Sequence, residues 1–203
     1  MNTLKLVLAS RNQNKVREIN AMISDYLPNV TLVSLDDVGL YEDVEETGKT
    51  FEENAILKAR YAAKSGYIAI ADDSGLVVPA LGGAPGVFSA RYAGEHGDDQ
   101  ANRDLLLKNL EGNPYRAAAF VCCIACVFPE GDGFTVRGHV EGEILCYERG
   151  TGGFGYDSLF WYDPAGQSFA EMSAEEKNAV SHRRRAIEAF SGKLAELLAA
   201  KNA

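Results

Sequence analysis

The sequence lacks the features that would place a chain in a membrane or outside the cell. Its longest apolar runs, such as residues 117–128, fall short of the roughly 20 apolar residues that a membrane-spanning helix needs. Met1 is followed by polar residues and a short strand-like run, without a cationic start and a cleavage site, so we expect no secretory signal. We also find no repeat, low-complexity tract or linker, and we expect residues 1–203 to form a single domain.

An excess of positive charge is missing as well. Lys and Arg number 20 against 29 Asp and Glu, which gives a net charge of −9 at pH 7. Because proteins that bind nucleic-acid polymers usually carry a basic surface, we expect neither DNA nor RNA as a partner. A single nucleotide remains open, since acidic residues gather in residues 36–53 and basic ones in 11–17 and 177–185. A metal–phosphate complex needs patches of both signs, although most charged runs are only solvated faces.

Cysteine is sparse, with four residues in the chain. Cys123 and Cys126 form a C-x-x-C pair, but no second pair follows at the spacing of a structural zinc site. Together with Cys122 they lie in an apolar, strand-like run, where a reduced thiol behaves as a small hydrophobic group. We therefore expect buried thiols and a reducing, cytoplasmic location.

Strand and helix patterns alternate along the chain, which predicts an α/β fold with a mixed sheet. Helices are expected after the polar turn at residues 10–15, after Thr50, at residues 99–110 and after Ser173, and capping-box patterns support the second and fourth of these. Strands are expected at residues 4–9, 30–35, 67–71, 117–128, 134–145 and 158–162. The third strand would deliver Asp72 and Asp73 at its carboxyl end, where α/β sheets bind ligands.

Two glycine motifs resemble nucleotide-binding signatures, but the residues around them do not fit such sites. Gly48-Lys49-Thr50 resembles the end of a P-loop, but Asp43 occupies the position where that loop needs glycine. Residues 150–155 satisfy G-x-G-x-x-G, but an aromatic, strand-like segment follows instead of the helix that a dinucleotide site requires. Neither motif predicts a site of its usual kind.

Two polar patches have side chains suited to a phosphate and a metal ion. Residues 10–15 form a turn between a strand and a helix, where helix N–H groups and Lys15 could meet an anion. Asp72 and Asp73 would repel one another unless a cation lay near them, and Mg²⁺ commonly binds one or two carboxylates together with phosphates. The alternative is an ordinary surface turn, because Asp-Asp-Ser-Gly also has the composition of a turn.

A third patch could hold a nucleotide base. Phe154 lies among glycines and is accessible enough for stacking, although a core aromatic is the commoner outcome. Lys177 and His182 are five residues apart and do not share a helical face. If both contact one ligand, the helix must break near Ser181.

At these residues the sequence resembles the inosine triphosphate pyrophosphatase family, which removes non-standard purine nucleotides. The resemblance rests on residues 8–19, 46–59, 71–78, 80–94, 151–157 and 176–183, in that order. It implies an α/β fold with an elongated mixed β-sheet flanked by helices, in two lobes around a central substrate cleft, and usually a homodimer. It also implies Mg²⁺-dependent hydrolysis of ITP, dITP or XTP to the monophosphate and pyrophosphate.

The resemblance also assigns roles by position. Asp73 would be the general base and a metal ligand, with Glu46 as the second metal carboxylate, Asp72 close by and Ser74 touching substrate. The remaining substrate-binding residues would be Ser10, Arg11, Asn12, Gln13, Asn14 and Lys15 at the triphosphate, Phe154, Gly155, Tyr156 and Asp157 at the base and sugar, and Lys177, His182 and Arg183. Ser10 and Arg11 stand where many relatives have Thr-Gly.

The expected mechanism is attack of water on the α-phosphorus, aided by charge neutralisation and by proton transfer to Asp73. Donors from His182 or Arg183 would favour a base with an oxygen at position six over adenine. The alternatives are a related pyrophosphatase acting on modified pyrimidine or methylated nucleotides, a catalytically silent nucleotide-binding module, and a structural protein whose charged clusters are solvated faces.

Overall fold

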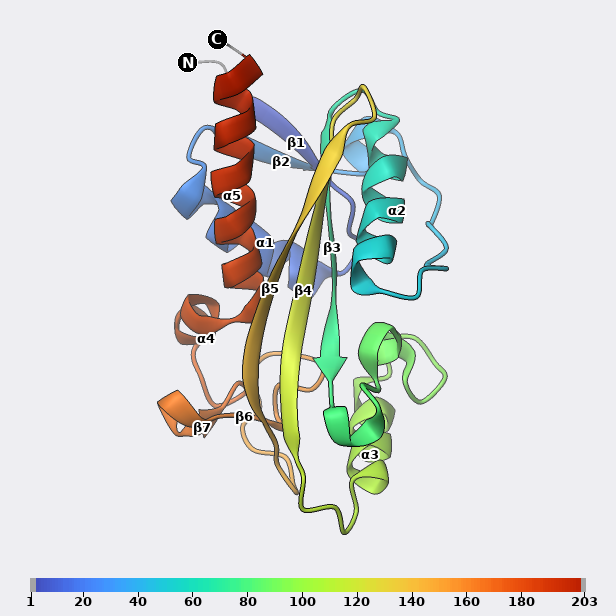
Figure 1. Cartoon of the computed structure of the whole chain (residues 1–203), viewed down its shortest axis with the longest axis vertical. Coiled ribbons are helices and arrows are strands. Elements are labelled where there is room, and N and C mark those ends of the chain that lie inside the picture. The colour runs from blue at the N-terminus through green and yellow to red at the C-terminus, as the bar shows by residue number, and fades with distance from the viewer. Residues whose placement is uncertain (1–2, 202–203) are drawn as a thin grey trace. The chain divides into compact units, whose positions relative to one another are not determined.

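A seven-stranded β-sheet with helices packed against it organises the chain in the computed structural model, which describes residues 3–201 (Figure 1). The strands are β1 (Leu4–Leu8), β2 (Val30–Ser34), β3 (Ile68–Val77), β4 (Ala117–Val127), β5 (Gly133–Ile144), β6 (Phe160–Tyr162) and β7 (Gln167–Ser168). The α-helices are α1 (Gln13–Tyr26), α2 (Phe51–Ala63), α3 (Asp99–Asn109), α4 (Ala174–Val180) and α5 (His182–Lys201). One of the short 3₁₀ segments, η3, spans Gly86–Arg91.

The sheet is mixed, as the alternation of strands and helices and the long hairpin predict. Its strand order is β2-β1-β3-β4-β5-β6-β7. β1 runs parallel to β2 and to β3, while β5, β6 and β7 pair antiparallel. The parallel part follows from the helical crossovers α1 and α2, and the antiparallel part from short connections. The prediction of an α/β fold is confirmed.

The described chain falls into two compact units, each assembled from separate stretches of sequence. Unit 1 takes in the chain up to Asp73, residues 122–138 and the chain from Arg183 onward. Unit 2 takes in residues 74–121 and 139–182. The strands β3, β4 and β5 each contribute residues to both units. The expectation that residues 1–203 form a single domain stays a prediction.

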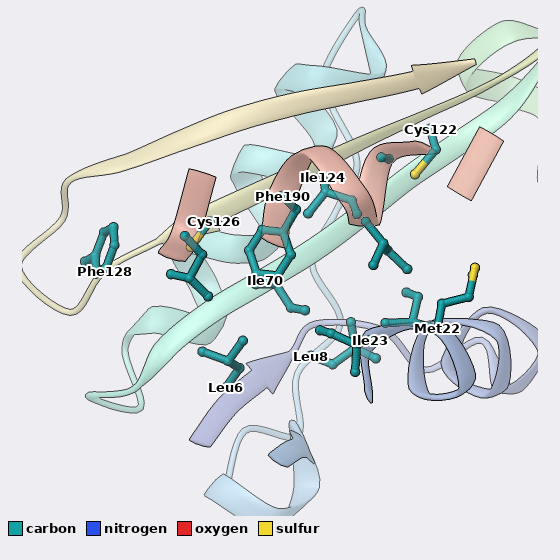
Figure 2. Packing of buried hydrophobic residues seen from close by; sticks show 14 residues of the cluster. Leu6, Leu8, Met22, Ile23, Ile70, Cys122, Ile124, Cys126, Phe128 and Phe190 are labelled. Atoms are coloured by element: carbon teal, nitrogen blue, oxygen red, sulfur yellow. The ribbon is translucent and has the colours of Figure 1, made fainter. Parts of the chain in front are cut away.

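The core of unit 1 lies between the strands and the helices α1 and α5. Alternate residues of β1 and β4 face this core, as the period of two in a strand requires. Figure 2 shows their side chains packed together with those of the two helices. Small residues of α2 are fully buried on the other side of the strands, which allows this helix to approach the sheet closely; they are Ala55, Ala59 and Ala62. Helices therefore cover both faces of the strands in unit 1.

Unit 2 has its own core, built largely from aromatic side chains. Phe120 stands within 4.6 Å of Phe160 and 5.9 Å of Phe169, measured between ring centroids. Apolar residues of β3, α3 and β5 complete this cluster, among them Leu76, Leu106 and Val140. Burial of large aromatic rings supplies much of the stability of such a core.

One strand differs from its prediction in a way that affects the site. β3 does not end before Asp72 but continues through both carboxylates and through Ser74 to Val77. The Asp-Asp-Ser-Gly string has the composition of a turn, yet Gly75 lets the strand pass close to η3, where a Cβ would meet the Ser89 hydroxyl at 2.3 Å. Ser89 also accepts the Leu76 N–H at 2.9 Å. The expected position of the carboxylates at a strand end is therefore wrong.

Other predictions from the sequence agree with the structure. The helical C-terminal region breaks at Ser181, whose extended backbone separates α4 from α5. Gly48-Lys49-Thr50 leads into the N-cap of α2, so it is not the end of a P-loop. Residues 150–155 are followed by turns and β6 rather than by a helix, so they are not a dinucleotide-binding motif. Cys122, Cys123 and Cys126 are buried free thiols. No helix within residues 3–201 is both long and apolar enough to cross a membrane.

Candidate functional site

The turn after β1 is held by the side chains at the start of α1. The carboxamide oxygen of Asn12 caps the helix, accepting N–H groups from Asn14 at 3.0 Å and Lys15 at 3.2 Å. The Ser10 hydroxyl accepts the Asn12 N–H at 3.3 Å. Arg11 turns away and pairs with Asp36 at 2.6 Å. The capped turn brings the Lys15 side chain toward β3.

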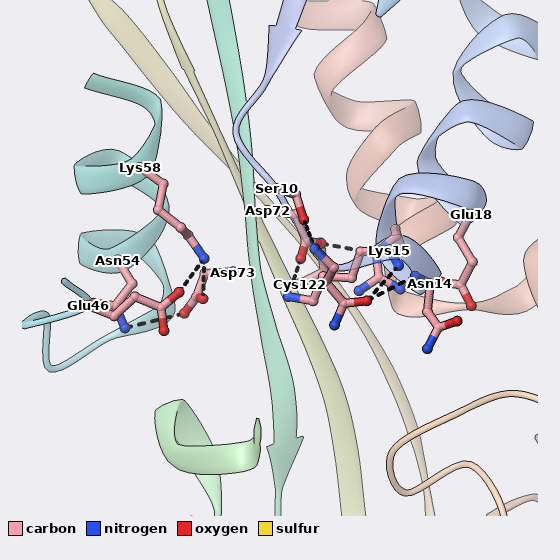
Figure 3. Close-up of polar contacts among 12 residues, drawn as sticks. Ser10, Asn14, Lys15, Glu18, Glu46, Asn54, Lys58, Asp72, Asp73 and Cys122 are labelled. Atoms are coloured by element: carbon pink, nitrogen blue, oxygen red, sulfur yellow. Dashed lines mark hydrogen bonds and ion pairs between the residues drawn. The ribbon is translucent and has the colours of Figure 1, made fainter. Parts of the chain in front are cut away.

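Asp72 lies between two cations on the α1 and α5 side of β3 (Figure 3). Lys15 Nζ lies 2.6 Å from one carboxylate oxygen, and the other accepts from Arg183 Nε at 3.0 Å and from the Cys122 thiol at 2.9 Å. Arg183 also pairs with Glu18. Burial alone would raise the pKa of Asp72, but the charges of Arg183 and Lys15 outweigh it and hold that pKa well below its usual range. Asp72 is thus an ionised, buried carboxylate.

Asp73 faces the opposite side of β3, toward α2 (Figure 3). The Lys58 ammonium donates to Asp73 and to Glu46, each at 2.7 Å, and Asn54 approaches the second oxygen of Asp73 at 3.4 Å. Burial raises the pKa of Asp73 above its ordinary value despite the charges of Lys58 and Lys15. Burial lowers the pKa of Lys58, but its two carboxylate partners outweigh this and leave that pKa raised. Two carboxylates therefore converge on one cation.

The structure divides the three predicted metal carboxylates between the two faces of one strand. Consecutive residues of a strand point to opposite faces, so Asp72 and Asp73 cannot face the same side while β3 stays extended. Glu46 shares the Lys58 ammonium with Asp73, and Asp72 pairs with Lys15. The Lys15 charge nevertheless acts on both aspartates.

The pairing of Glu46 with Asp73 suits a magnesium–phosphate complex better than a metal cage of protein ligands. Across residues 3–201, no group of three or more His, Cys, Asp or Glu side chains is placed to surround a metal ion. Mg²⁺ commonly uses one or two carboxylates and completes its shell with water and phosphate oxygens. Two carboxylates that already converge on a cation, Lys58, meet this requirement.

In unit 2, the residues of the glycine-rich loop are organised around Asp157. One oxygen of its carboxylate accepts the Phe154 N–H at 2.9 Å and the Lys177 ammonium at 2.5 Å. The same ammonium lies 4.7 Å from the centre of the Phe154 ring. Gly153 has a φ of 69°, and a Cβ there would stand 2.1 Å from the Asp157 carboxylate, so this position requires glycine. Lys177 and Asp157 are a buried ion pair.

The other predicted residues of unit 2 lie in or near its core. The His182 ring stacks on Phe120 at 4.9 Å, and the Tyr156 hydroxyl donates to the Ser89 carbonyl at 2.9 Å. Burial raises the pKa of Tyr156, so its phenol is neutral. Ser74 is half-buried on β3.

The predicted residues therefore form two groups. Unit 1 contains the turn at residues 10–15, both aspartates, Glu46 and Arg183, divided between the two faces of β3. Unit 2 holds Ser74, His182, the 154–157 segment and Lys177. Sequence reasoning missed Lys58 and Asn54. Their spacing of four residues on the helix predicted after Thr50 was the signal that could have found them, because it places both on one face.

The chain is thus an α/β protein with a mixed sheet, in which ion-paired carboxylates lie on both faces of β3 beside the capped start of α1. A sequence model of the Ham1 family matches residues 6–193, and the chain belongs to this family.

Relatives match over nearly the full length of both chains. A dITP/XTP pyrophosphatase of Geobacter sulfurreducens is 55% identical over 186 residues, covering 90% of this chain and 92% of the relative. The solved structure of the Staphylococcus aureus Ham1 protein is 42% identical with a TM-score of 0.86, covering 95% of this chain and 98% of that one. A dITP/XTP pyrophosphatase structure from Mycobacterium abscessus is 47% identical with a TM-score of 0.76, covering 92% and 98%.

Proposed function

We propose that this chain is a nucleoside triphosphate pyrophosphatase that converts ITP, dITP or XTP to the monophosphate and pyrophosphate. The observation that carries the proposal is the convergence of Glu46 and Asp73 on the Lys58 ammonium at 2.7 Å each. Relatives at 45–55% identity that are named dITP/XTP pyrophosphatase support the same activity. Removal of such nucleotides would keep non-standard purines out of the nucleotide pool.

Mg²⁺ is the cofactor in this proposal, and Glu46 and Asp73 are the residues that would hold it. When bound, the ion supplies charge neutralisation for the phosphates and acidifies a coordinated water. The hard oxygen donors of the two carboxylates suit this ion. Lys58 keeps the two carboxylates together through its ion pairs, so their mutual repulsion is compensated before any ligand arrives.

The other residues of unit 1 have roles that follow from their contacts. Asp73 accepts the proton of the attacking water, and Lys15 with the start of α1 neutralises phosphate charge. Asp72 holds the Lys15 ammonium at 2.6 Å and is itself fixed by Arg183. We assign Asp72 the role of a positioning residue for Lys15. A metal-ligand role for Asp72 stays a prediction from the family resemblance.

The base and sugar are assigned to residues of unit 2. Phe154 offers an aromatic face, and Lys177 and Asp157 fix its backbone and ring. His182 stacks on Phe120. The Arg183 side chain is 1% exposed and engaged by Asp72 and Glu18, which favours a structural part in the phosphate site over a part in reading the base. Its contact with the substrate stays a prediction from the family resemblance.

A nucleotide panel tests the proposal. Pyrophosphate release is measured with Mg²⁺ for ITP, dITP, XTP, GTP, ATP and a modified pyrimidine triphosphate. We expect kcat/KM for the oxo-purines ITP and XTP to exceed that for ATP by about two orders of magnitude, because a donor at the base, from His182 or a backbone N–H, would lose its acceptor when the adenine amine replaces the oxygen at position six. Equal rates for all purines would remove the sanitising role, and a preference for the pyrimidine would select the related pyrophosphatase instead.

A cytoplasmic location and a homodimer belong to the same proposal. Three buried free thiols are typical of a reducing compartment, which supports the first. The family resemblance supports the second. Light scattering coupled to size-exclusion chromatography should give twice the chain mass of 22.0 kDa, and a mass of one chain at micromolar concentration would remove the dimer from the proposal.

A further inference from the structure

The loop that carries Phe154 is held from outside by the helix α3. Asp99 accepts the Gly155 N–H at 2.7 Å, and Arg103 donates to the Gly155 carbonyl at 2.8 Å. Both polar groups of one peptide residue are thus bound by side chains four positions apart, on one face of one helix. Gly155 follows Asp99 by 56 residues and Arg103 by 52. We call Asp99, Arg103 and their contacts with Gly155 the α3 clamp.

The clamp is itself fixed by a polar network. Arg103 donates to the Gln100 side chain at 2.7 Å and lies 2.9 Å from the Glu148 carboxylate. Glu148 also accepts from Gln100 at 2.9 Å and from Ser158 at 2.7 Å. Burial opposes ionisation of Glu148, but these hydrogen bonds outweigh it and lower its pKa. A guanidinium fork with acceptors on three sides has little freedom to turn.

Gly155 needs this support because of its backbone. Its φ is 60°, the left-handed region, and a Cβ at this position would meet no atom within 4 Å. Glycine is therefore required here by the left-handed backbone conformation and not by a lack of room for a side chain. Glycine also loses the most conformational freedom on folding, so external hydrogen bonds are what keep such a residue in one conformation. Because Gly155 directly follows Phe154, a fixed Gly155 backbone restricts the path of the chain at Phe154.

The loop thus has two independent anchors. Asp157 and Lys177 hold the Phe154 N–H and ring, and the α3 clamp holds the next residue. We propose that Asp99 and Arg103 are positioning residues that set the Phe154 face for the nucleotide base and thereby control discrimination among bases. The inference rests on the proposed function, because it takes the ligand of this loop to be the base of a nucleoside triphosphate.

The test compares matched variants of α3. Arg103→Met and Asp99→Ala remove the two halves of the clamp, while Asp99→Asn keeps an oxygen that can accept the Gly155 N–H. Lys108→Met and Glu111→Ala are the controls, because both residues are exposed, Lys108 in the last turn of α3 and Glu111 just after its C-cap. Steady-state kinetics with dITP and ATP are combined with calorimetric binding of dITP and of inorganic tripolyphosphate in EDTA. Tripolyphosphate has the phosphates of the substrate without its base.

We expect Arg103→Met and Asp99→Ala to raise KM and Kd for dITP about ten-fold or more and to lower the preference for dITP over ATP, since small displacements of positioning groups carry such costs. Tripolyphosphate affinity should stay within about two-fold of the unmodified protein, and Asp99→Asn should behave nearly as the unmodified protein. A variant that fails to fold is recognised by its far-ultraviolet circular dichroism. In that case the variant of the other clamp residue provides the test.

Unchanged dITP affinity and unchanged discrimination in the folded variants would overturn the inference. An equal loss for dITP and tripolyphosphate would overturn it too, because it would mean general disorder rather than loss of base positioning. Failure of the proposed function is distinguishable from either outcome. In that case the unmodified protein itself would neither release pyrophosphate nor bind dITP more tightly than tripolyphosphate.

Discussion

At the scale of single residues, the central feature is the difference between two neighbouring aspartates. Asp72 is neutralised by Lys15 and Arg183, and its pKa lies well below the ordinary value; Asp73 shares Lys58 with Glu46, and its pKa is raised by burial. Two side chains of the same type thus have different environments, because consecutive residues of a strand point to opposite faces of the sheet. A carboxylate with raised basicity is the better proton acceptor.

Replacing Asp73 with Asn tests this difference. We expect kcat to fall by about 10²-fold or more, the usual contribution of a positioned base, while dITP binding largely survives because the amide keeps the shape of the site. Stopped assays of pyrophosphate release and calorimetry measure the two effects. Asp132→Asn, at an exposed position between β4 and β5, serves as the control. Near-normal turnover in Asp73→Asn would remove the assignment of the base.

Lys58→Met should expose the repulsion between its two partners. Breaking a buried ion pair by removing one member leaves uncompensated charge, and we expect a loss of about 3 kcal/mol of folding stability. Mg²⁺ should restore part of this loss, so the rise in Tm on adding Mg²⁺ should be larger in the variant than in the unmodified protein. Differential scanning calorimetry with Mg²⁺ or EDTA measures both. An equal rise in the two proteins would contradict a shared cation site at Glu46 and Asp73.

The sequence shows which side chains are present here but not which of them meet. The capping patterns place the N-caps Thr50 and Ser173 correctly, because their partners lie within three residues. Lys58 was missed because its partners Glu46 and Asp73 are 12 and 15 residues away in sequence, and only the fold brings them together. Arg183 is a stronger case, since 111 residues separate it from Asp72.

At the scale of elements, the capping box of α4 makes a defined contribution. The Ser173 hydroxyl accepts the Glu176 N–H at 3.2 Å, and the Glu176 carboxylate accepts the Ser173 N–H at 2.8 Å. Ser173→Ala should lower the free energy of unfolding by about 1 kcal/mol, and Ser173→Thr should restore it. Urea denaturation measures the change. Equal stability of Ser173→Ala and the unmodified protein would mean that solvent replaces the cap without cost.

Element prediction succeeded where the pattern is local and failed at β3. The helices α1, α2 and α3 and the hairpin of β4 and β5 lie close to their expected positions, since hydrophobic period and capping residues determine them. The four polar or small residues 72–75 favour a turn, but tertiary packing against Ser89 extends the strand through them. Strand propensity depends on such neighbours more than helix propensity does.

At the scale of the whole molecule, burial should make the four thiols differ in their rates of reaction. Cys122, Cys123 and Cys126 are buried and Cys146 is exposed. Burial raises the pKa of Cys123 to about 11 and that of Cys126 to about 12, so below those values both stay protonated and unreactive. We expect one thiol to react rapidly with an aromatic disulfide reagent at pH 8 and all four after denaturation.

Cys146→Ser is the matched variant for this measurement. It should abolish the rapid phase and leave the slow phase unchanged, because the other three thiols react only when the core opens. Two rapid thiols in the unmodified protein would contradict the burial of the cysteines in β4.

The discontinuous make-up of the two units has a consequence for how such a protein can be altered. The chain passes from one unit to the other four times, after residues 73, 121, 138 and 182. No continuous gene fragment therefore encodes either unit. Recombination could neither exchange nor delete one of them by a single pair of cuts that leaves the other intact, so the carboxylates of unit 1 and the loop of Phe154 must be inherited together.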